Sequence, residues 1–399
     1  MNRNLQNTLQ ELLEREVENK NVAGVNVLIR QSDADIAYAQ AGHADVASAK
    51  PFDRDTIMRV YSMSKPITAA AVMILVQRGL IAMGEPVEKY LPGFKDQVIY
   101  DETGEKNVVR PAYVRDLMCM TSGLPYGNAE GTVTEKRVQK LFDEVDAALY
   151  TDHALPTVEI ANRIGEAGVD FQPGSAWKYG TSADVLGAIV EIASGVSFGE
   201  FLREELFEPL GMNDTGFYVP EAKRDRIASV YERRNGELEL FETNHLGIKY
   251  SLDSEPAFQS GGAGLTSTLD DYARFAQMLL NGGSFNGHTI LNEATIRFMT
   301  HGALTTTQRD YLWATWDSLC GYDYGCLMRH AIKPEMAFHY TWPGEYGWDG
   351  WLGTFFANMP SNLSPGATGN VTVLIGMQIS NPEGNFISEK VRNVTVGKL

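Results

Sequence analysis

The feature that most restricts the fold is a helix that is apolar on nearly every face. Its sequence, ITAAAVMILVQRGL, follows Pro66, and both Gly79 and the segment Gly84-Glu85-Pro86 mark its end. Because such a helix leaves water only when other elements cover it on most sides, we expect it at the centre of a core. A chain of 399 residues that is 44% hydrophobic can build that core, as one large domain or as two interleaved domains.

Strand patterns occur near both ends of the chain. Residues 23–31 and 34–42 predict two strands joined by a polar turn, and residues 353–360 and 370–381 have the β-branched, apolar character of buried strands. The first twenty residues predict an amphipathic helix whose apolar stripe consists of Leu5, Leu9, Leu12, Leu13 and Val17. The simplest assembly is an antiparallel sheet built from both ends of the chain.

The middle of the chain is rich in helical patterns closed by glycine. Residues 183–195 and 198–211 are examples, and residues 270–283 predict another helix before the C-terminal strands. We therefore expect an α+β fold in which helices flank an antiparallel sheet and a mainly helical domain is inserted, with the active site between the two domains. The expected limits are 1–75 with 245–399 for the sheet domain and 76–244 for the helical domain.

The charge of the chain disfavours two classes of partner. A formal net charge of −17 and a pI near 4.9, without a run of Lys or Arg, repel nucleic-acid phosphates and anionic membranes. The N-terminus lacks the apolar region of a signal peptide, and no later segment approaches the length of a membrane span. We expect a cytoplasmic enzyme, and the sequence leaves its oligomeric state open.

Metal or cofactor chemistry is not indicated by the sequence. Cys119, Cys320 and Cys326 are too few for a disulfide framework, and no pair of histidines completes a zinc site. The glycine-rich segment 260–264 lacks the flanking residues of a phosphate-binding loop and predicts a tight turn. We expect neither a metal nor a cofactor.

Ser62 and Lys65 are the strongest candidates for chemistry. They lie three residues apart at the start of the buried helix, so their side chains share one face. A lysine desolvated by an apolar helix loses basicity and can accept the proton of a serine hydroxyl, while the free N–H groups of the helix end favour negative charge on a substrate oxygen. The structural alternative is a helix-capping Ser62 with a solvated Lys65; Ser64 is the better local cap, which leaves Ser62 free.

Two other serines match short catalytic patterns. Ser175 and Lys178 repeat the same spacing but follow Pro173-Gly174 in an expected loop, where nothing holds the side chains together. The segment 195–199, GVSFG, matches the nucleophile elbow of α/β-hydrolases, yet one helical pattern ends there and another begins, so we expect a helix C-cap followed by a serine N-cap. The seven histidines form no recognisable triad signature.

An ordered series of segments resembles the serine β-lactamase and penicillin-binding protein superfamily. The likeness is to the class C β-lactamase-like branch, which includes the family VIII carboxylesterases, and it runs from about residue 20 to the C-terminus. Besides the Ser62 motif, the segments are EPVEKYLPGF (85–94), VRDLMCMTSGLP (114–125), PGSAWKYGTSADVLG (173–187), LFEPLGMNDTGF (206–217), GGAGLTSTLDDYARFAQMLLNGG (261–283) and GWDGWLGTFF (347–356). The resemblance implies a β-lactamase/transpeptidase-like fold and an acyl-enzyme mechanism.

The resemblance also implies a role for each motif residue. Ser62 matches the acylated nucleophile, Lys65 its proton acceptor, and Tyr179 a tyrosine that shares the general-base role and passes the proton to the leaving group. Its local sequence alone would make Tyr179 an ordinary core residue, but beside the Lys65 ammonium its phenol should be pulled towards ionisation. By analogy, the backbone N–H groups of Ser62 and Trp351 form the oxyanion hole. The third motif, on a strand edging the site, is matched by Trp348, Asp349 and Gly350.

Three positions depart from the family patterns. Trp348 stands where β-lactamases and cell-wall peptidases have a lysine that helps bind the substrate carboxylate, and Thr181 stands where class C enzymes have a substrate-contacting asparagine. Both departures resemble the esterase branch, and an apolar plane in place of a cation favours neutral acyl esters. Asp349 departs even from the Trp-Gly-Gly of the esterases. It either selects a cationic or amino-bearing substrate or, as we favour, faces solvent.

We therefore expect a serine hydrolase that forms an acyl-enzyme on Ser62 and acts as a carboxylesterase on small neutral acyl esters. Its partner is a small-molecule ester or amide substrate. The alternatives within enzymes are a β-lactamase, a D-amino-acid peptidase or amidase, and an acyltransferase. A non-hydrolytic penicillin- or peptide-binding module is the alternative of a different class, and the presence of Ser62, Lys65 and Tyr179 together argues against it.

Overall fold

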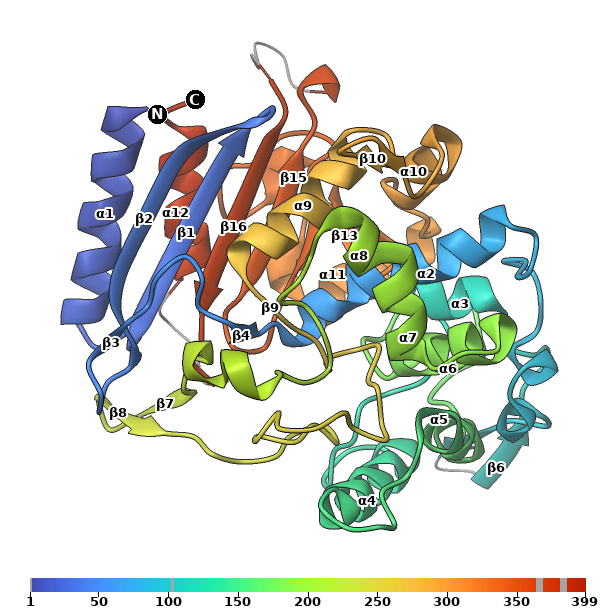
Figure 1. The fold of residues 1–399 in the computed structure, drawn as a ribbon. Helices are drawn as coiled ribbons and strands as arrows, with labels where there is room; N and C mark the ends of the chain where they lie inside the picture. The colour runs from blue at the N-terminus through green and yellow to red at the C-terminus, as the bar shows by residue number, and fades with distance from the viewer. Residues whose placement is uncertain (1, 102–103, 364–368, 381–385) are drawn as a thin grey trace.

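The computed structural model describes residues 2–101, 104–363, 369–380 and 386–399, and an antiparallel sheet dominates it (Figure 1). The order of the strands across this sheet is β12-β13-β14-β15-β16-β1-β2-β3. Their bounds are Gly24–Gln31 (β1), Ala34–Asp45 (β2), Lys50–Pro51 (β3), Tyr322–Gly325 (β12), Met328–Ala331 (β13), Tyr346–Asp349 (β14), Phe355–Met359 (β15) and Val371–Met377 (β16). The predicted N-terminal hairpin and both C-terminal strands are confirmed, although position 381 of the last one lies outside the described residues.

The two ends of the chain meet inside this sheet, where β1 pairs with β16 and Val27 lies opposite Ile375. Because side chains alternate along a strand, one face carries Val27 and Val373 towards helices α1 (Arg3–Glu18) and α12 (Ile387–Val396). The α1 stripe is confirmed: Leu5, Leu9, Leu12 and Leu13 are buried, and Val17 packs at its margin. The opposite face packs on α2 and α9. The expected α+β fold is therefore confirmed.

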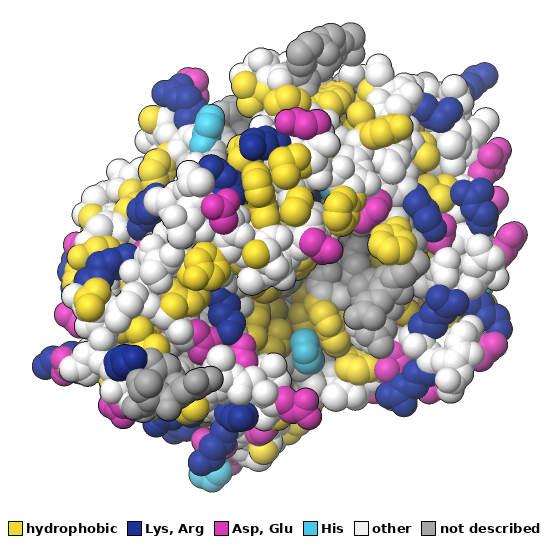
Figure 2. All heavy atoms as spheres, turned by 180° about the vertical axis from the view of Figure 1, so that it is seen from behind, with side chains coloured by type: hydrophobic (Ala, Val, Ile, Leu, Met, Phe, Trp, Pro, Cys, Tyr) yellow, Lys and Arg dark blue, Asp and Glu magenta, His cyan; other side chains and the backbone are white. Residues whose placement is uncertain are grey.

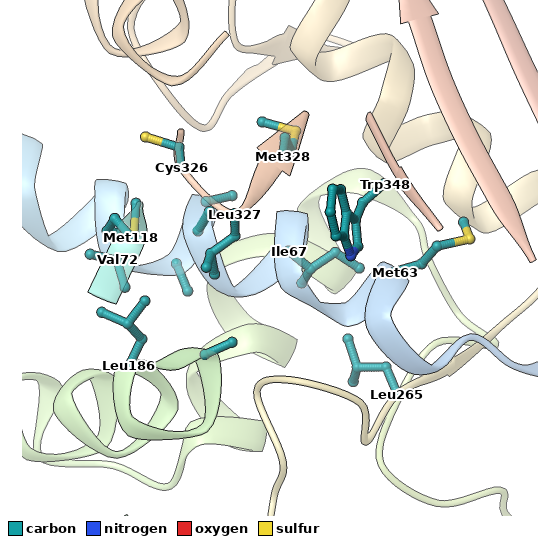
Figure 3. Close-up of a cluster of buried hydrophobic side chains, with 14 of the residues drawn as sticks. Met63, Ile67, Val72, Met118, Leu186, Leu265, Cys326, Leu327, Met328 and Trp348 are labelled. Carbon is teal, nitrogen blue, oxygen red and sulfur yellow. The ribbon is translucent and has the colours of Figure 1, made fainter. Parts of the chain in front are cut away.

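Helix α2 (Ser64–Gln77) is the central helix that the sequence predicts. Every side chain from Ser64 to Leu75 is buried, because α6 covers one side of α2 and strand β13 the other (Figure 3). The helix ends before Gly79, whose φ of 72° only glycine adopts readily. The prediction that Ser64 caps α2 is wrong. The chain enters through the 3-10 turn Tyr61–Met63, so Ser64 is already helical and its Oγ instead accepts a hydrogen bond from the Leu265 N–H at 3.1 Å.

The segment between the two halves of the sheet is mainly helical, as expected. Its helices are α3 (Val114–Met118), α4 (Val133–Ala148), α5 (Thr157–Glu166), α6 (Ser182–Ser194), α7 (Phe198–Leu202) and α8 (Glu208–Leu210), followed later by α9 (Leu269–Leu280), α10 (Glu293–Met299) and α11 (Thr306–Thr315). A π-helical turn, Arg203–Phe207, interrupts the helix predicted over 198–211. The proposed domain limits, 1–75 with 245–399 and 76–244, stay a prediction.

Short two-stranded sheets complete the described fold. They are β4 (Met58–Arg59) with β9 (Thr266–Ser267), β5 (Val98–Asp101) with β6 (Gly104–Asn107), β7 (Tyr231–Arg234) with β8 (Glu237–Leu240), and β10 (Ser284–Phe285) with β11 (His288–Thr289). The strands β5 to β8 were not predicted within the helical segment.

Among the described residues, no single helix is long and apolar enough to cross a membrane. Only the bent pair Ser182–Ser194 and Phe198–Leu210 passes that test of length and composition together.

Candidate active site

Ser62 lies in the 3-10 turn that leads into α2, next to the end of β14. The preceding Tyr61 has a φ of 43°, a left-handed conformation that costs a tyrosine free energy and persists only where the surroundings enforce it. Those surroundings are tight: the carbonyl of Val60 accepts a hydrogen bond from Thr354 Oγ1 at 3.2 Å, and a Cβ on Gly350 would approach the same oxygen to 2.4 Å. The turn that carries Ser62 is thus held against the third motif.

Lys65 points back at Ser62 from the first turn of α2. Its Nζ is hydrogen-bonded to Ser62 Oγ and to the Tyr126 hydroxyl, each at 3.0 Å, and donates to the carbonyl of Gly262 at 2.8 Å. Burial lowers the pKa of Lys65 to about 7, and the nearby carboxylate of Asp184 partly opposes that change. A large fraction of Lys65 is therefore unprotonated near neutral pH and able to accept the Ser62 proton.

Tyr179 completes the group. Its ring lies under Lys65, with Nζ 4.6 Å from the ring centroid, and its hydroxyl accepts a hydrogen bond from Trp348 Nε1 at 2.9 Å. Burial raises the pKa of Tyr179 well above its usual value, and hydrogen bonds with Ser62 and Trp348 offset only part of the increase. The expectation that Lys65 pulls this phenol towards ionisation is therefore wrong, because desolvation outweighs it. Tyr179 rests as a proton donor.

Tyr126 belongs to the same cluster and was missed by the sequence analysis. Its ring meets that of Tyr179 edge-on, with 5.6 Å between the centroids, and its hydroxyl bonds Lys65. The recognised segment 114–125 stops one residue before it, and a tyrosine in a Gly/Pro-rich loop has no fixed spacing to Ser62. Its position next to that segment was the available signal.

The tight turn predicted at 260–264 is confirmed and supports Lys65. The Gly264 N–H donates to the carbonyl of Ser260 at 3.0 Å. Asp184, a buried residue of α6 that the sequence did not single out, accepts from Ser260 Oγ at 2.5 Å and from the Gly262 N–H at 3.0 Å. Asp184 thus fixes the turn whose Gly262 carbonyl in turn bonds Lys65.

The third-motif residues line the same space from β14. Trp348 is buried within an aromatic group that includes Trp316, at 5.8 Å between ring centroids, and Tyr324, at 5.0 Å. The Trp351 ring stacks on His245 at 4.0 Å. Within the described part of the chain, neither the Ser62 N–H nor the Trp351 N–H donates a backbone hydrogen bond.

Two predicted binding residues are placed differently. Thr181 is fully buried and does not line the cavity described below; its hydroxyl donates to the carbonyl of Pro125 at 3.3 Å. Asp349 is 56% exposed, but it does not simply face solvent, because its Oδ1 pairs with the Arg329 guanidinium at 2.6 Å.

The cluster opens into a cavity of about 800 Å³. Ser62, Tyr179, Trp348, Gly350 and Trp351 all line it, together with further aromatic side chains. Figure 2 shows one face of the molecule hollowed near its centre, where hydrophobic side chains gather. A cavity rich in aromatic side chains around the Ser62 hydroxyl suits an acyl substrate of small-molecule size.

The other two serine patterns are structural, as predicted. Ser175 lies in a turn, and its partner Lys178 is engaged elsewhere, by Glu135 at 2.6 Å and by Asp170. Gly195 closes α6 with a φ of 79°, and Ser197 Oγ accepts from the Glu200 N–H as the N-cap of α7. Among the residues that the structure describes, no group of three or more His, Cys, Asp or Glu side chains could hold a metal ion.

Comparison with known proteins identifies the family and the fold. The family described as Beta-lactamase matches residues 9–393. Protein Rv1367c of Mycobacterium tuberculosis is 30% identical over 350 residues, covering 85% of this chain and 83% of the relative, and Esterase EstB of Burkholderia gladioli is 30% identical over 376 residues, covering 90% of each. The solved structure of EstCE1, a hydrolase with promiscuous acyltransferase activity, shares the fold, with a TM-score of 0.81 at 22% identity over 98% of both chains.

The family match spans nearly the whole chain, including both halves of the sheet and the helical segment between them. It confirms the resemblance predicted from the ordered sequence segments. This chain belongs to the beta-lactamase family.

Proposed function

We propose that this protein is a serine carboxylesterase of the family VIII type that forms an acyl-enzyme on Ser62 and acts on small neutral acyl esters. The observation that carries the proposal is the buried Lys65 amine, 3.0 Å from Ser62 Oγ and with a pKa near 7. An amine with such a pKa is a matched general base for a serine hydroxyl at neutral pH.

In the proposed reaction, Ser62 Oγ attacks the ester carbonyl while its proton passes to Lys65 Nζ. The N–H groups of Ser62 and Trp351, which have no other backbone acceptor in the described chain, hold the oxyanion. The Tyr179 hydroxyl protonates the departing alkoxide and is reprotonated from Lys65. Water then attacks the acyl carbonyl and gives a proton to Lys65, which passes it to Ser62 Oγ as the acyl–oxygen bond breaks. The acid leaves with Ser62 restored.

The preference for neutral esters rests on Trp348. Its buried indole occupies the position where β-lactamases place a cation, and its N–H is already bonded to Tyr179. A substrate carboxylate gains no partner from this residue. Acyl transfer to an alcohol is the second candidate function, because EstCE1, whose fold this chain shares, is described as having promiscuous acyltransferase activity. A cytoplasmic location is proposed on the sequence alone.

The test is hydrolysis of p-nitrophenyl butyrate compared with that of a chromogenic cephalosporin. We expect the ester to be the better substrate by kcat/KM, and Ser62→Ala to reduce its turnover by roughly four orders of magnitude or more. Ser175→Ala and Ser197→Ala are the matched controls and should retain activity. Faster turnover of the cephalosporin, or an active Ser62→Ala variant, would contradict the proposal. Adding a short alcohol and measuring ester exchange tests the acyltransferase.

A further inference from the structure

An almost wholly buried arginine lies behind the third motif. Arg329 comes from β13, directly opposite Gly347 of β14, and its side chain is 2% exposed. The guanidinium lies over the ring of Phe355, 4.7 Å from the centroid, and the residue lines the same cavity as Ser62. The family lysine is missing at position 348, but the site still holds a cation close by.

Carboxylates balance this cation. Arg329 donates to Asp349 at 2.6 Å, to Glu345 at 3.4 Å and to the carbonyl of Phe356 at 3.2 Å. Glu345 is fully buried and is shared with Arg392 of α12 at 2.5 Å. Two arginines therefore face two carboxylates. Asp349, at 56% exposure, is the member of this group that the solvent reaches most easily, since the other three are at most 3% exposed.

The pair lies close to the reacting centre. Asp349 is the last residue of β14, and the following Gly350 packs against the carbonyl of Val60, two residues before Ser62. The Arg329–Asp349 pair is therefore one residue away from a glycine that packs against the turn carrying Ser62.

We infer that Asp349 determines acyl specificity by masking Arg329, so that removing its charge converts the site from neutral to anionic acyl esters. This inference rests on the proposed esterase function. An aspartate bonded to a buried arginine has little attraction left for a substrate cation, and an arginine so paired has little left for a substrate anion. The paired charges of Arg329 and Asp349 therefore disfavour cationic and anionic substrates alike.

Other charged and titratable groups that line this side of the cavity limit what can replace Asp349. His339 is uncharged near neutral pH, because burial lowers its pKa to about 3. Glu389 of α12 lines the cavity too, near Arg392. Glu345 keeps its own bond to Arg329 at 3.4 Å, and Glu389 is a further carboxylate at this cavity, so Glu389→Gln is tested alongside.

The experiment compares three p-nitrophenyl esters: the monoester of adipic acid, its neutral methyl ester, and the ester of ε-aminocaproic acid. We expect Asp349→Asn to raise the anionic-to-neutral ratio of kcat/KM by about tenfold or more, and Glu389→Gln to raise it further in that background. Asp317→Asn is the control for lost charge, since Asp317 is exposed and adjoins the cavity-lining Ser318; it should leave the ratio unchanged. Adding Arg329→Met to Asp349→Asn should return the ratio to its original value.

The outcomes are distinct. If the unaltered protein does not hydrolyse the neutral ester, the proposed function fails. If it does, but the ratio stays within twofold in folded Asp349→Asn and Asp349→Ser, the masking inference fails alone. A strong preference of the unaltered protein for the cationic ester that Asp349→Asn abolishes would also overturn it, because Asp349 would then bind substrate directly. Thermal unfolding of each variant shows that the compared proteins are folded.

Discussion

The base that we propose for Ser62 is one lysine that the fold removes from water. Burial lowers the pKa of Lys65 to about 7, while the negative charge of Asp184 raises it. In the proposed mechanism only the unprotonated amine accepts the Ser62 proton, so the rate of acylation should follow the neutral fraction of Lys65.

We expect kcat/KM for a neutral ester to rise with pH through about 7 and to level off above it, since Lys65 loses its proton over that range. Asp184→Asn removes the charge that favours the ammonium form, so the midpoint should move to lower pH. The measurement is the pH–rate profile of both proteins. Asp310→Asn, which alters an exposed carboxylate, should leave the midpoint in place. A midpoint that rises in Asp184→Asn contradicts the assignment.

At this scale the sequence predicts what is local. Ser62 and Lys65 are three positions apart where the 3-10 turn Tyr61–Met63 runs into α2, so their contact follows from local helical geometry. Tyr126 and Asp184 reach the site from distant segments, and no periodicity connects them to Ser62. The direction of the Tyr179 pKa shift could not be predicted either, because it depends on how completely the folded chain excludes water from the phenol.

The element that positions the site is α2. Small side chains, such as the fully buried Ala69, Ala70 and Ala71, allow α6 and the sheet to approach it closely. Interiors at crystal-like packing density have no room for added methylenes, so this close approach leaves the helix sensitive to volume.

Ala70→Leu should therefore lower the free energy of unfolding by about 1–3 kcal/mol through overpacking. Chemical denaturation monitored by circular dichroism measures it. The same substitution at Ala82, an exposed residue after the end of α2, should change the free energy by less than about 0.5 kcal/mol. Equal effects at the two positions would mean that α2 is not the tightly enclosed helix described.

The elements that the sequence predicts are those with an apolar pattern. Helix α2 and strands β15 and β16 are buried, and their continuous apolar sequences predict that burial. Strand β6 is exposed along its whole length and has the sequence GEKN, so no hydrophobic alternation marks it. The π-helical turn between α7 and α8 cannot be predicted from the sequence either, because the helical pattern of its neighbours continues through it.

At the scale of the whole molecule, α1 lies away from the candidate site. Helices α1 and α12 pack on the sheet face that carries Val27 and Val373, and α2 packs on the opposite face (Figure 1). Of these two outer helices, α12 also brings Glu389 and Arg392 to the cavity, whereas no residue of α1 lines it. The sheet joins both ends of the chain, so α1 contributes to the fold without touching the candidate site.

Leu9→Ala in α1 should accordingly lower the free energy of unfolding by about 2–5 kcal/mol, since Leu9 is fully buried. At a temperature where the variant is folded, kcat/KM for a neutral ester should remain within twofold. Glu11→Ala, at an exposed position of the same helix, controls for changes in helix propensity. A large loss of kcat/KM in folded Leu9→Ala would mean that α1 is coupled to the site.

The central claim is that Ser62, activated by Lys65, is the nucleophile. Reaction with a fluorophosphonate probe, followed by mass mapping of the peptides, tests it most directly, because the probe phosphonylates only activated serines. We predict one adduct per chain, on Ser62, that forms far more slowly in Lys65→Met and is absent in Ser62→Ala. An adduct on Ser175 or Ser197, or labelling that persists in Ser62→Ala, would contradict the account.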